Sequence, residues 1–171
     1  MATRRVVTGH TPDGRAVVAS DEQVEVMSLG PAGATYEAVW ARDDPAHFPD
    51  DGGAPSVSGG FPPPGGVAFG ITLVPPGANR ELDDSILANR PEEADPDDPG
   101  MHRTATLDFE YVVEGTLTLE LDDGCTVELG PGDVVVQNGT RHRWSNRGDT
   151  PVKFIAVTVG AHHDIKGGKP V

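Results

Sequence analysis

The sequence predicts an all-β fold, either a sandwich or a barrel, on three observations. After Thr106, short apolar runs alternate with tight turns such as 122-DDGC-125 and 130-GPGD-133, without helical periodicity. Gly 22 and Pro 16 together exceed a fifth of the 171 residues, which favours turns over long helices. With 36% hydrophobic and 5% aromatic residues, the chain can bury one core of Val, Leu and Ile. We therefore expect one globular domain.

The N-terminal part predicts strands and then a long irregular segment. RRVVTG, TPDG and RAVVAS indicate a β-hairpin, and VEVMSL and ATYEAVWA indicate two further strands. Residues 43–66 are too rich in proline and glycine for either a strand or a helix. Since this part is too small for a core of its own, we expect residues 1–66 to pack on a main domain formed by residues 67–160.

The main domain begins with VAFGITLVPPG and is then interrupted by residues 80–100, which carry eight acidic residues. Within this segment DDSILANR predicts a short helix, with Asp84 or Ser85 as N-cap. The segment is either a solvated surface loop or a lid over a pocket. Its position directly before His102 is the reason to consider a lid. The remaining strands are LDFEYVVEG, TLTLEL, TVEL, VVVQN, HRWSN and VKFIAVTVG, and residues 161–171 form a tail that we expect to fray.

Charge and composition restrict the partners. A net charge of −14 argues against nucleic acid or an anionic membrane surface as a partner. The single cysteine excludes an internal disulfide framework. No apolar run approaches the ~20 residues of a membrane span, and the N-terminus lacks the apolar segment of a signal peptide. We expect a cytoplasmic protein with a small-molecule partner.

One strand carries an unusual run of polar side chains. Because side chains alternate between the faces of a strand, residues 102, 104, 106, 108 and 110 share one face, which reads His, Thr, Thr, Asp, Glu. Five polar residues on an inward face are too expensive for a hydrophobic core. The sequence therefore predicts a barrel whose interior is a ligand cavity along this strand.

Two stretches that include this strand resemble a known pair of motifs. The stretches are 102-HRTATLDFEYVVEG-115 and 132-GDVVVQNGTRHRWSN-146, and the matching positions are His102, Thr104, Asp108, Gly115, Gly132, Gly139, His142 and Asn146. They resemble the two motifs of the cupin superfamily, and their amino-acid sequence is similar to that of a group of small bacterial single-domain cupins. Over residues 67–160 the resemblance implies a double-stranded β-helix, or jelly-roll, barrel. It also implies a homodimer, in which we expect the strands of residues 4–40 to pack on the partner subunit.

The resemblance also implies a metal site, with two departures from the family pattern. Cupins with a full site use His, His, Glu and His as ligands, whereas this chain has Thr104 for the second histidine and Asp108 for the glutamate. The predicted ligands are His102, Asp108 and His142, and they would leave open positions on a divalent ion such as Zn, Fe, Mn or Ni. The alternative is a metal-free pocket in which the two histidines form hydrogen bonds.

The barrel of this family hosts many reactions, so the resemblance does not fix one. The predicted function is a small-molecule enzyme that uses a divalent metal as Lewis acid on a carbonyl or carboxylate substrate, in a dehydration, isomerisation, decarboxylation or cyclisation. Asp108, Glu110 and Thr104 are the candidate catalytic residues. Candidate substrate-binding residues are Trp144, which shares a face with His142, Thr106 and Gln137. Two alternatives stay open: an iron dioxygenase on the same triad, and a non-catalytic module that binds a metabolite.

Overall fold

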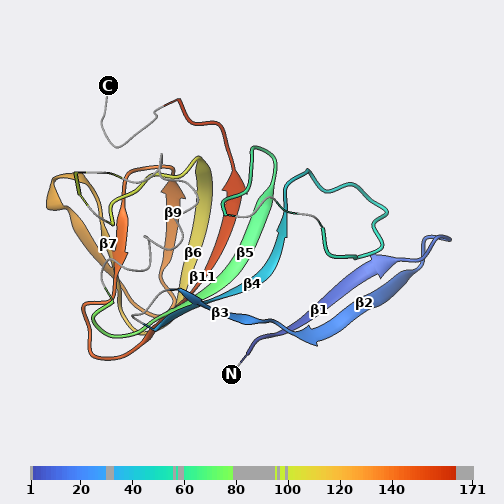
Figure 1. Cartoon of the computed structure of the whole chain (residues 1–171), viewed down its shortest axis with the longest axis horizontal. Coiled ribbons are helices and arrows are strands. Elements are labelled where there is room, and N and C mark those ends of the chain that lie inside the picture. The colour runs from blue at the N-terminus through green and yellow to red at the C-terminus, as the bar shows by residue number, and fades with distance from the viewer. Residues whose placement is uncertain are drawn as a thin grey trace.

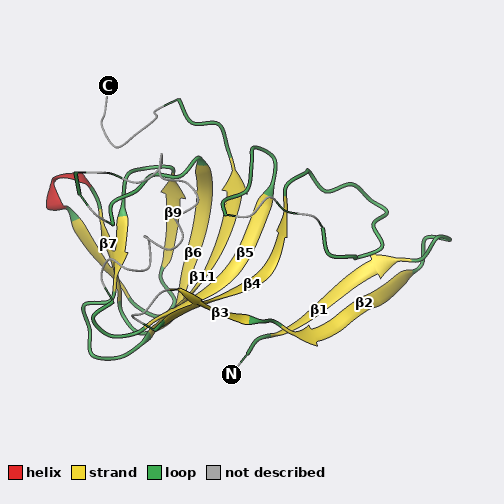
Figure 2. Ribbon diagram, viewed as in Figure 1, coloured by secondary structure: helices red, strands yellow, loops and turns green. Residues whose placement is uncertain are grey.

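The computed structural model describes residues 2–29, 33–55, 57, 60–78, 95, 97–98 and 100–164 (Figure 1). Within this part of the chain the regular structure consists of β-strands and a 3-10 turn at Asp122–Gly124 (Figure 2). The all-β prediction is thereby confirmed. No helix in the described ranges is long and apolar enough to cross a membrane.

The largest sheet has six antiparallel strands in the order β3-β4-β5-β11-β6-β9. These strands are β3 (Val26–Leu29), β4 (Ala34–Arg42), β5 (Val67–Val74), β11 (Val152–Gly160), β6 (Thr106–Glu114) and β9 (Val134–Asn138). The last strand of the chain lies between β5 and β6, which is the crossed connection of a jelly roll rather than a simple meander. Because β4 pairs along β5, strands from both sides of residue 66 belong to one sheet.

A second sheet of three strands faces the first. Its order is β10 (Arg143–Ser145), β7 (Leu117–Glu120) and β8 (Thr126–Leu129). The turn from β6 into β7 is made by Gly115 at φ 79°, where a side chain would also collide with the backbone carbonyl of Pro151.

The apolar core fills only one end of the space between these sheets. Its buried members include Val74, Val112, Leu117, Val152 and Phe154, and they come from the C-terminal end of β5, the second half of β6, the start of β7 and the first half of β11. The opposite halves of the same strands present Ala68, Asp108 and Thr158 to the interior instead. The barrel therefore has a packed end and a hollow end.

The first two strands form a separate hairpin. β1 (Arg4–His10) and β2 (Ala16–Gln23) pair only with each other and extend away from the barrel (Figure 1). The hairpin is tied to β4 at its base, where the backbone N–H of Thr3 donates to Glu37 Oε2 at 2.7 Å and Arg5 Nη1 donates to the carbonyl of Val39 at 2.8 Å.

The strand predictions are confirmed for the N-terminal hairpin, for the two strands after it and for the strands that follow Val67. The helix predicted within DDSILANR and most of the 80–100 segment fall outside the described residues, as does most of the predicted tail.

Candidate functional site

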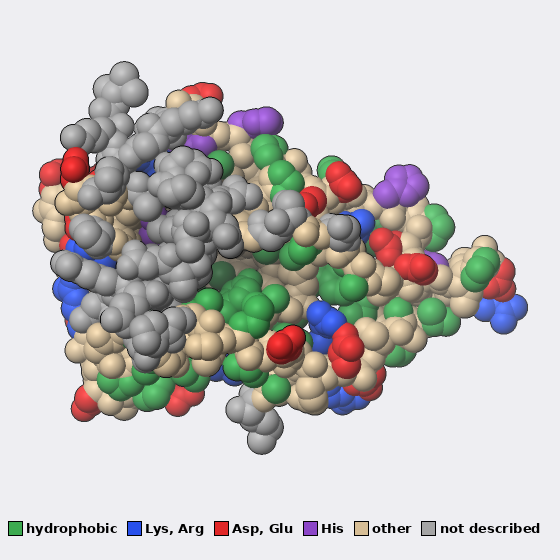
Figure 3. Space-filling view, in the orientation of Figure 1, with side chains coloured by type: hydrophobic (Ala, Val, Ile, Leu, Met, Phe, Trp, Pro, Cys, Tyr) green, Lys and Arg blue, Asp and Glu red, His purple; other side chains and the backbone are tan. Residues whose placement is uncertain are grey.

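The hollow end of the barrel contains a cavity of about 400 Å³. One part of its lining is apolar and includes Met27, Leu29, Phe61, Pro62, Trp144 and Phe154. The other part is polar and consists mainly of His102, Thr104, Asp108, Glu110 and His142. On the face shown in Figure 3, hydrophobic side chains gather in a hollow near the centre. An amphipathic small molecule is the natural occupant of such a space.

The five polar residues predicted to share one strand face are buried together, but the strand itself is shorter than predicted: β6 begins at Thr106, and His102 and Thr104 lie in the segment before it. His102, Thr104, Thr106, Asp108 and Glu110 are all buried, each at most 5% exposed, while the intervening residues of β6 are more exposed. Thr104 Oγ1 lies 2.6 Å from Thr106 Oγ1, and Thr106 Oγ1 donates to Asp108 Oδ2 at 3.1 Å. Since Thr106 has one hydroxyl proton, Thr104 must be the donor in the first contact. The two threonines thus form a chain that holds one oxygen of Asp108.

The two motif histidines are neighbours. His102 and His142 form an isolated antiparallel bridge with both backbone N–H···O distances at 2.9 Å, and their ring centroids are 4.2 Å apart. His102 Nδ1 lies 3.2 Å from the carbonyl of Gly100, and His142 Nδ1 lies 2.9 Å from the carbonyl of Thr140. The Gly100 carbonyl favours the tautomer of His102 with the proton on Nδ1, which makes Nε2 its acceptor or ligand atom. His142 Nδ1 faces both the Thr140 carbonyl and the amide nitrogen of Gln137 at 2.9 Å. Burial, with the neighbouring His102, lowers the pKa of His142 to about 3, so this imidazole is neutral.

The two buried carboxyl groups have shifted pKa values. Burial raises the pKa of Asp108 to about 6, against the opposing effects of Thr106, Thr158 and His102. Burial, reinforced by the charge of Asp108, raises the pKa of Glu110 to about 8. Asp108 Oδ1 and Glu110 Oε2 are buried and accept no hydrogen bond from the residues that the structure describes. Near neutral pH, Asp108 is therefore mostly ionised and Glu110 mostly protonated.

The donor atoms fit a divalent ion in their chemistry. Two imidazoles lie side by side, and Asp108, whose Oδ1 accepts no hydrogen bond from the described residues, lines the same cavity. Among the described residues, no three His, Cys, Asp or Glu side chains are gathered closely enough to form a ready site. The pair of histidines is thus in place, and the triad with Asp108 stays a prediction.

The three predicted substrate-binding residues occupy different places. Trp144 lines the cavity, edge-on to His142 at a centroid distance of 5.6 Å and 6.1 Å from Phe154, so it forms an apolar wall. Thr106 and Gln137 are buried but do not border the cavity. The Gln137 amide donates to the carbonyl of Thr140 at 2.8 Å and lies 2.9 Å from His142 Nδ1. Gln137 therefore contacts the loop and ring of His142.

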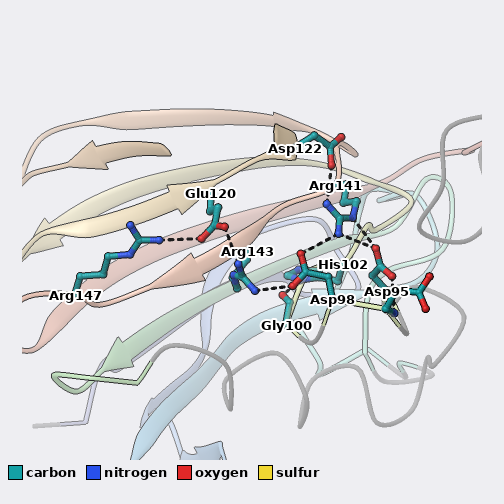
Figure 4. Close-up of polar contacts among 10 residues, drawn as sticks. Asp95, Asp98, Gly100, His102, Glu120, Asp122, Arg141, Arg143 and Arg147 are labelled. Carbon is teal, nitrogen blue, oxygen red and sulfur yellow. Dashed lines mark hydrogen bonds and ion pairs between the residues drawn. The ribbon is translucent and has the colours of Figure 1, made fainter. Parts of the chain in front are cut away.

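An ion-pair network braces the outer side of the histidine pair (Figure 4). Arg141 and Arg143, on either side of His142, pair with acidic residues from the segment before His102 and from the β7–β8 turn region: Asp95, Asp98, Glu120 and Asp122. The network joins the segment that leads into His102 to the strand that follows His142. Sequence reasoning did not anticipate this pairing, although the alternation 141-RHR-143 and the acidic run before His102 are its signal.

Tyr36 and Phe61 also line the cavity and were not anticipated. Tyr36 lies on a strand that the sequence does predict. Nothing local shows, however, that this strand joins the wall of the barrel, because strand order is set by long-range pairing.

Comparison with known proteins agrees with this architecture. Residues 91–158 match the family model described as Cupin_2, a cupin domain. The chain is 48% identical over 62 residues to the Phomopsin biosynthesis cluster protein C' of Diaporthe leptostromiformis, which covers 36% of this chain and 33% of that protein. It is 33% identical over 72 residues to the cupin-domain-containing oxidoreductase fogC of Aspergillus ruber, covering 40% of this chain and 36% of that protein.

These matches span about a third of the length of the curated relatives, which are fungal rather than bacterial. Among solved structures, the Cnp3 cupin domain of Schizosaccharomyces pombe aligns over 94% of this chain and 89% of its own, with a TM-score of 0.53 at 9% identity. Identity this low establishes a shared fold and nothing about activity. Residues 91–158 are thus similar to a cupin domain, and the crossed jelly-roll sheet gives the chain the double-stranded β-helix fold of that family.

Proposed function

We propose that this chain is a small-molecule enzyme that transfers protons on a carbonyl- or carboxylate-bearing metabolite, in a dehydration, isomerisation, decarboxylation or cyclisation. The observation that carries the proposal is the pair Asp108 and Glu110. Both carboxyl groups are buried on one strand face beside an apolar wall, and each has an oxygen that no group in the described part of the chain hydrogen-bonds. Such groups destabilise a fold, and they are typical of sites where a substrate supplies the missing partner.

The two carboxyl groups have complementary proton states. Asp108 and Glu110 are two residues apart on β6, about 7 Å along the strand. With the pKa of Asp108 near 6 and that of Glu110 near 8, one group can accept a proton and the other can donate one at neutral pH. The Thr104–Thr106 chain fixes Asp108 Oδ2 and leaves Oδ1 to meet the substrate.

A divalent ion held by His102 and His142, with Asp108 as third ligand, would supply Lewis-acid polarisation of the substrate carbonyl. Zn, Fe, Mn and Ni all suit imidazole and carboxylate donors. With Asp108 engaged in that way, proton transfer falls to Glu110. Thr104 then orients a water or a substrate oxygen through its hydroxyl.

A second candidate is a redox enzyme, and one observation favours it. Relatives from Aspergillus ruber, Neurospora crassa and Hypocrea virens are named cupin-domain-containing oxidoreductases. Two histidines and a carboxylate are also the ligands of non-haem iron oxygenases. A third candidate, a module that binds a metabolite without converting it, is compatible with the same cavity.

Exchange of hydrogen for deuterium separates these candidates. The purified protein, with and without added Zn²⁺, Mn²⁺, Ni²⁺ or Fe²⁺, is incubated in D₂O with a panel of ketones and keto acids. Mass spectrometry then follows deuterium at the carbon next to the carbonyl. We expect exchange that Glu110→Gln abolishes and that Glu114→Gln, an exposed carboxyl on the same strand, leaves unchanged. Oxygen consumption without exchange would favour the redox candidate, and binding without either would favour the module.

A further inference from the structure

We propose that the cavity has a second polar pole at Tyr36, whose hydroxyl lies over Gly70 and donates a hydrogen bond to an uncharged oxygen of a flat substrate lying over Ala156. The inference rests on the proposed function, because it names the shape and a substituent of the same substrate. It assigns a binding role to a residue outside both motifs.

The first observation is the close approach of Tyr36 to Gly70. Tyr36 on β4 pairs with Thr72 on β5, and its side chain leans along the sheet toward Gly70. A Cβ atom on Gly70 would overlap the ring and the hydroxyl of Tyr36. Glycine weakens the interior of a strand and often marks a site where another group approaches closely. Gly70 therefore makes the space that lets the phenol lie flat on the sheet at the edge of the cavity.

The second observation is the row of residues that continues from Gly70 across the sheet. Gly70 pairs with Ala156 on β11, and Ala156 pairs with Glu110 on β6. Two strand spacings separate Gly70 from Glu110, which is roughly 10 Å between backbones. Because the phenol covers Gly70, Ala156 is the residue of this row that lies between the phenol and the carboxyl group. Its methyl group forms a flat floor with a hydrogen-bonding group at each end, on which one planar ring fits.

The third observation is the unmet hydrogen-bonding capacity of the phenol. No hydrogen bond to the Tyr36 hydroxyl is found within the described ranges, although Tyr36 borders the cavity. Burial raises the pKa of Tyr36 above its usual value, so the hydroxyl keeps its proton and remains a donor. A substrate oxygen is the acceptor that the geometry leaves for it.

The charges around the cavity indicate what kind of oxygen this is. In the described part of the lining there is no Lys or Arg, and the opposite end of the floor carries the acidic residues Asp108 and Glu110. A ligand carboxylate at Tyr36 would face these acids with only a neutral donor to stabilise it. A ketone or aldehyde oxygen, or a ring hydroxyl, pairs with the phenol without that repulsion. The apolar walls of Trp144 and Phe154 suit the faces of an aromatic or conjugated ring.

Three ring compounds of similar size test the proposal by calorimetric titration: acetophenone, ethylbenzene and benzoate. We expect the parent protein to bind acetophenone more tightly than ethylbenzene or benzoate. Tyr36→Phe should weaken acetophenone binding about five- to tenfold, the size of one neutral hydrogen bond, and leave ethylbenzene binding unchanged. Tyr111→Phe removes an exposed phenol from the outer face of the same sheet and should change nothing.

Gly70→Ala adds a methyl group under the ring and should weaken acetophenone binding at least as much as Tyr36→Phe. Should it fail to fold, Tyr36→Phe alone still decides the outcome. The proposal is overturned if the parent does not prefer acetophenone, or if Tyr36→Phe binds it as the parent does. Failure of the proposed proton-transfer function would look different. The protein would still prefer acetophenone in a way that depends on Tyr36, but no bound ketone would exchange deuterium.

Discussion

Burial in the cavity raises the pKa of Glu110 and so sets the protonation state of this proposed proton donor. Its folded-state pKa of about 8 exceeds the ordinary value of 4.5, so the folded protein binds the proton more tightly than the unfolded chain does. Between pH 4.5 and 8 the unfolded chain releases this proton first. The contribution of Glu110 therefore makes the free energy of unfolding fall as pH rises through that window and level off above about pH 8.

Replacing Glu110 with Gln should remove this part of the pH dependence. We expect Glu110→Gln to be more stable than the parent at pH 8, by an amount on the order of a few kcal/mol, and to converge with it near pH 4.5. Urea unfolding at both pH values, in the presence of a chelator, measures the difference. Glu114→Gln is the matched control, since Glu114 lies exposed at the end of the same strand. Equal gains at both pH values would show that the pKa of Glu110 is not raised.

The residue at position 104 determines how many imidazoles are available to bind a metal ion. The Thr104 side chain is 1% exposed, borders the cavity and donates to Thr106. We expect Thr104→Ala to leave Zn²⁺ affinity nearly intact, because a neutral hydroxyl is a poor ligand. Thr104→His should tighten Zn²⁺ binding, because it adds a third imidazole on the face that carries His102. Calorimetric titration of the chelator-treated protein measures both affinities.

The matched variants for this measurement are His102→Ala and His142→Ala. Each should abolish tight Zn²⁺ binding if the imidazole pair forms the centre of the site. Retention of the parent's metal content by both variants would rule out the predicted ligands. The histidines would then serve as hydrogen-bonding groups, and the binding-module candidate would move ahead.

At the scale of elements, the position of His102 beside His142 depends on the ion pairs that join the segment before His102 to Arg141. Arg141 bonds Asp95 at 2.7 Å and Asp98 at 3.2 Å, both in the segment before His102, and it also bonds Asp122. We expect Arg141→Met to speed hydrogen exchange of the backbone amides of His102 and His142, which bond each other's carbonyls, by roughly tenfold or more. Exchange in β7 and β8 should stay unchanged.

Asp122→Asn is the matched control for the network. Asp122 is 55% exposed in its side chain and touches Arg141 from the other side, so its loss leaves the bonds to Asp95 and Asp98 intact. Exchange at His102 should then resemble that of the parent. Equal acceleration in both variants would mean that the network acts on global stability rather than on the position of the histidines.

The sequence predicted those features of the site that depend on local order. Alternation along β6 placed Asp108 and Glu110 on a common buried face, whereas His102 lies before this strand and joins the site through its bridge to His142, the second motif histidine. The position of Tyr36 over Gly70 could not be predicted, because it depends on β4 and β5 being neighbours in register. The Arg141–Asp95 contact likewise joins residues 46 positions apart, and a charge pattern alone does not choose among many acidic partners.

At the scale of the whole molecule, the hairpin of β1 and β2 requires explanation. It projects from the barrel and exposes Val6, Val17 and Val18, the last at 64% (Figure 1). A two-stranded hairpin is marginally stable in water unless something packs against it. We propose that the hairpin packs on a second copy of the chain, in a symmetric homodimer.

Light scattering should therefore give the parent twice the chain mass of 17.9 kDa at micromolar concentration. Val18→Asp places a charge on the exposed hairpin, so we expect it to shift the protein to the monomer without loss of the β-rich circular dichroism spectrum. The control is Val134→Asp on β9, where Val134 and Tyr111 form an exposed apolar pair on the outer face of the large sheet. Dissociation by Val134→Asp but not by Val18→Asp would place the interface on the barrel face instead. A parent that scatters as a monomer would mean that the contacts of the hairpin with β4 and with residues 50–52, such as the 2.8 Å bond from the His10 N–H to the Asp50 carbonyl, are enough to hold it.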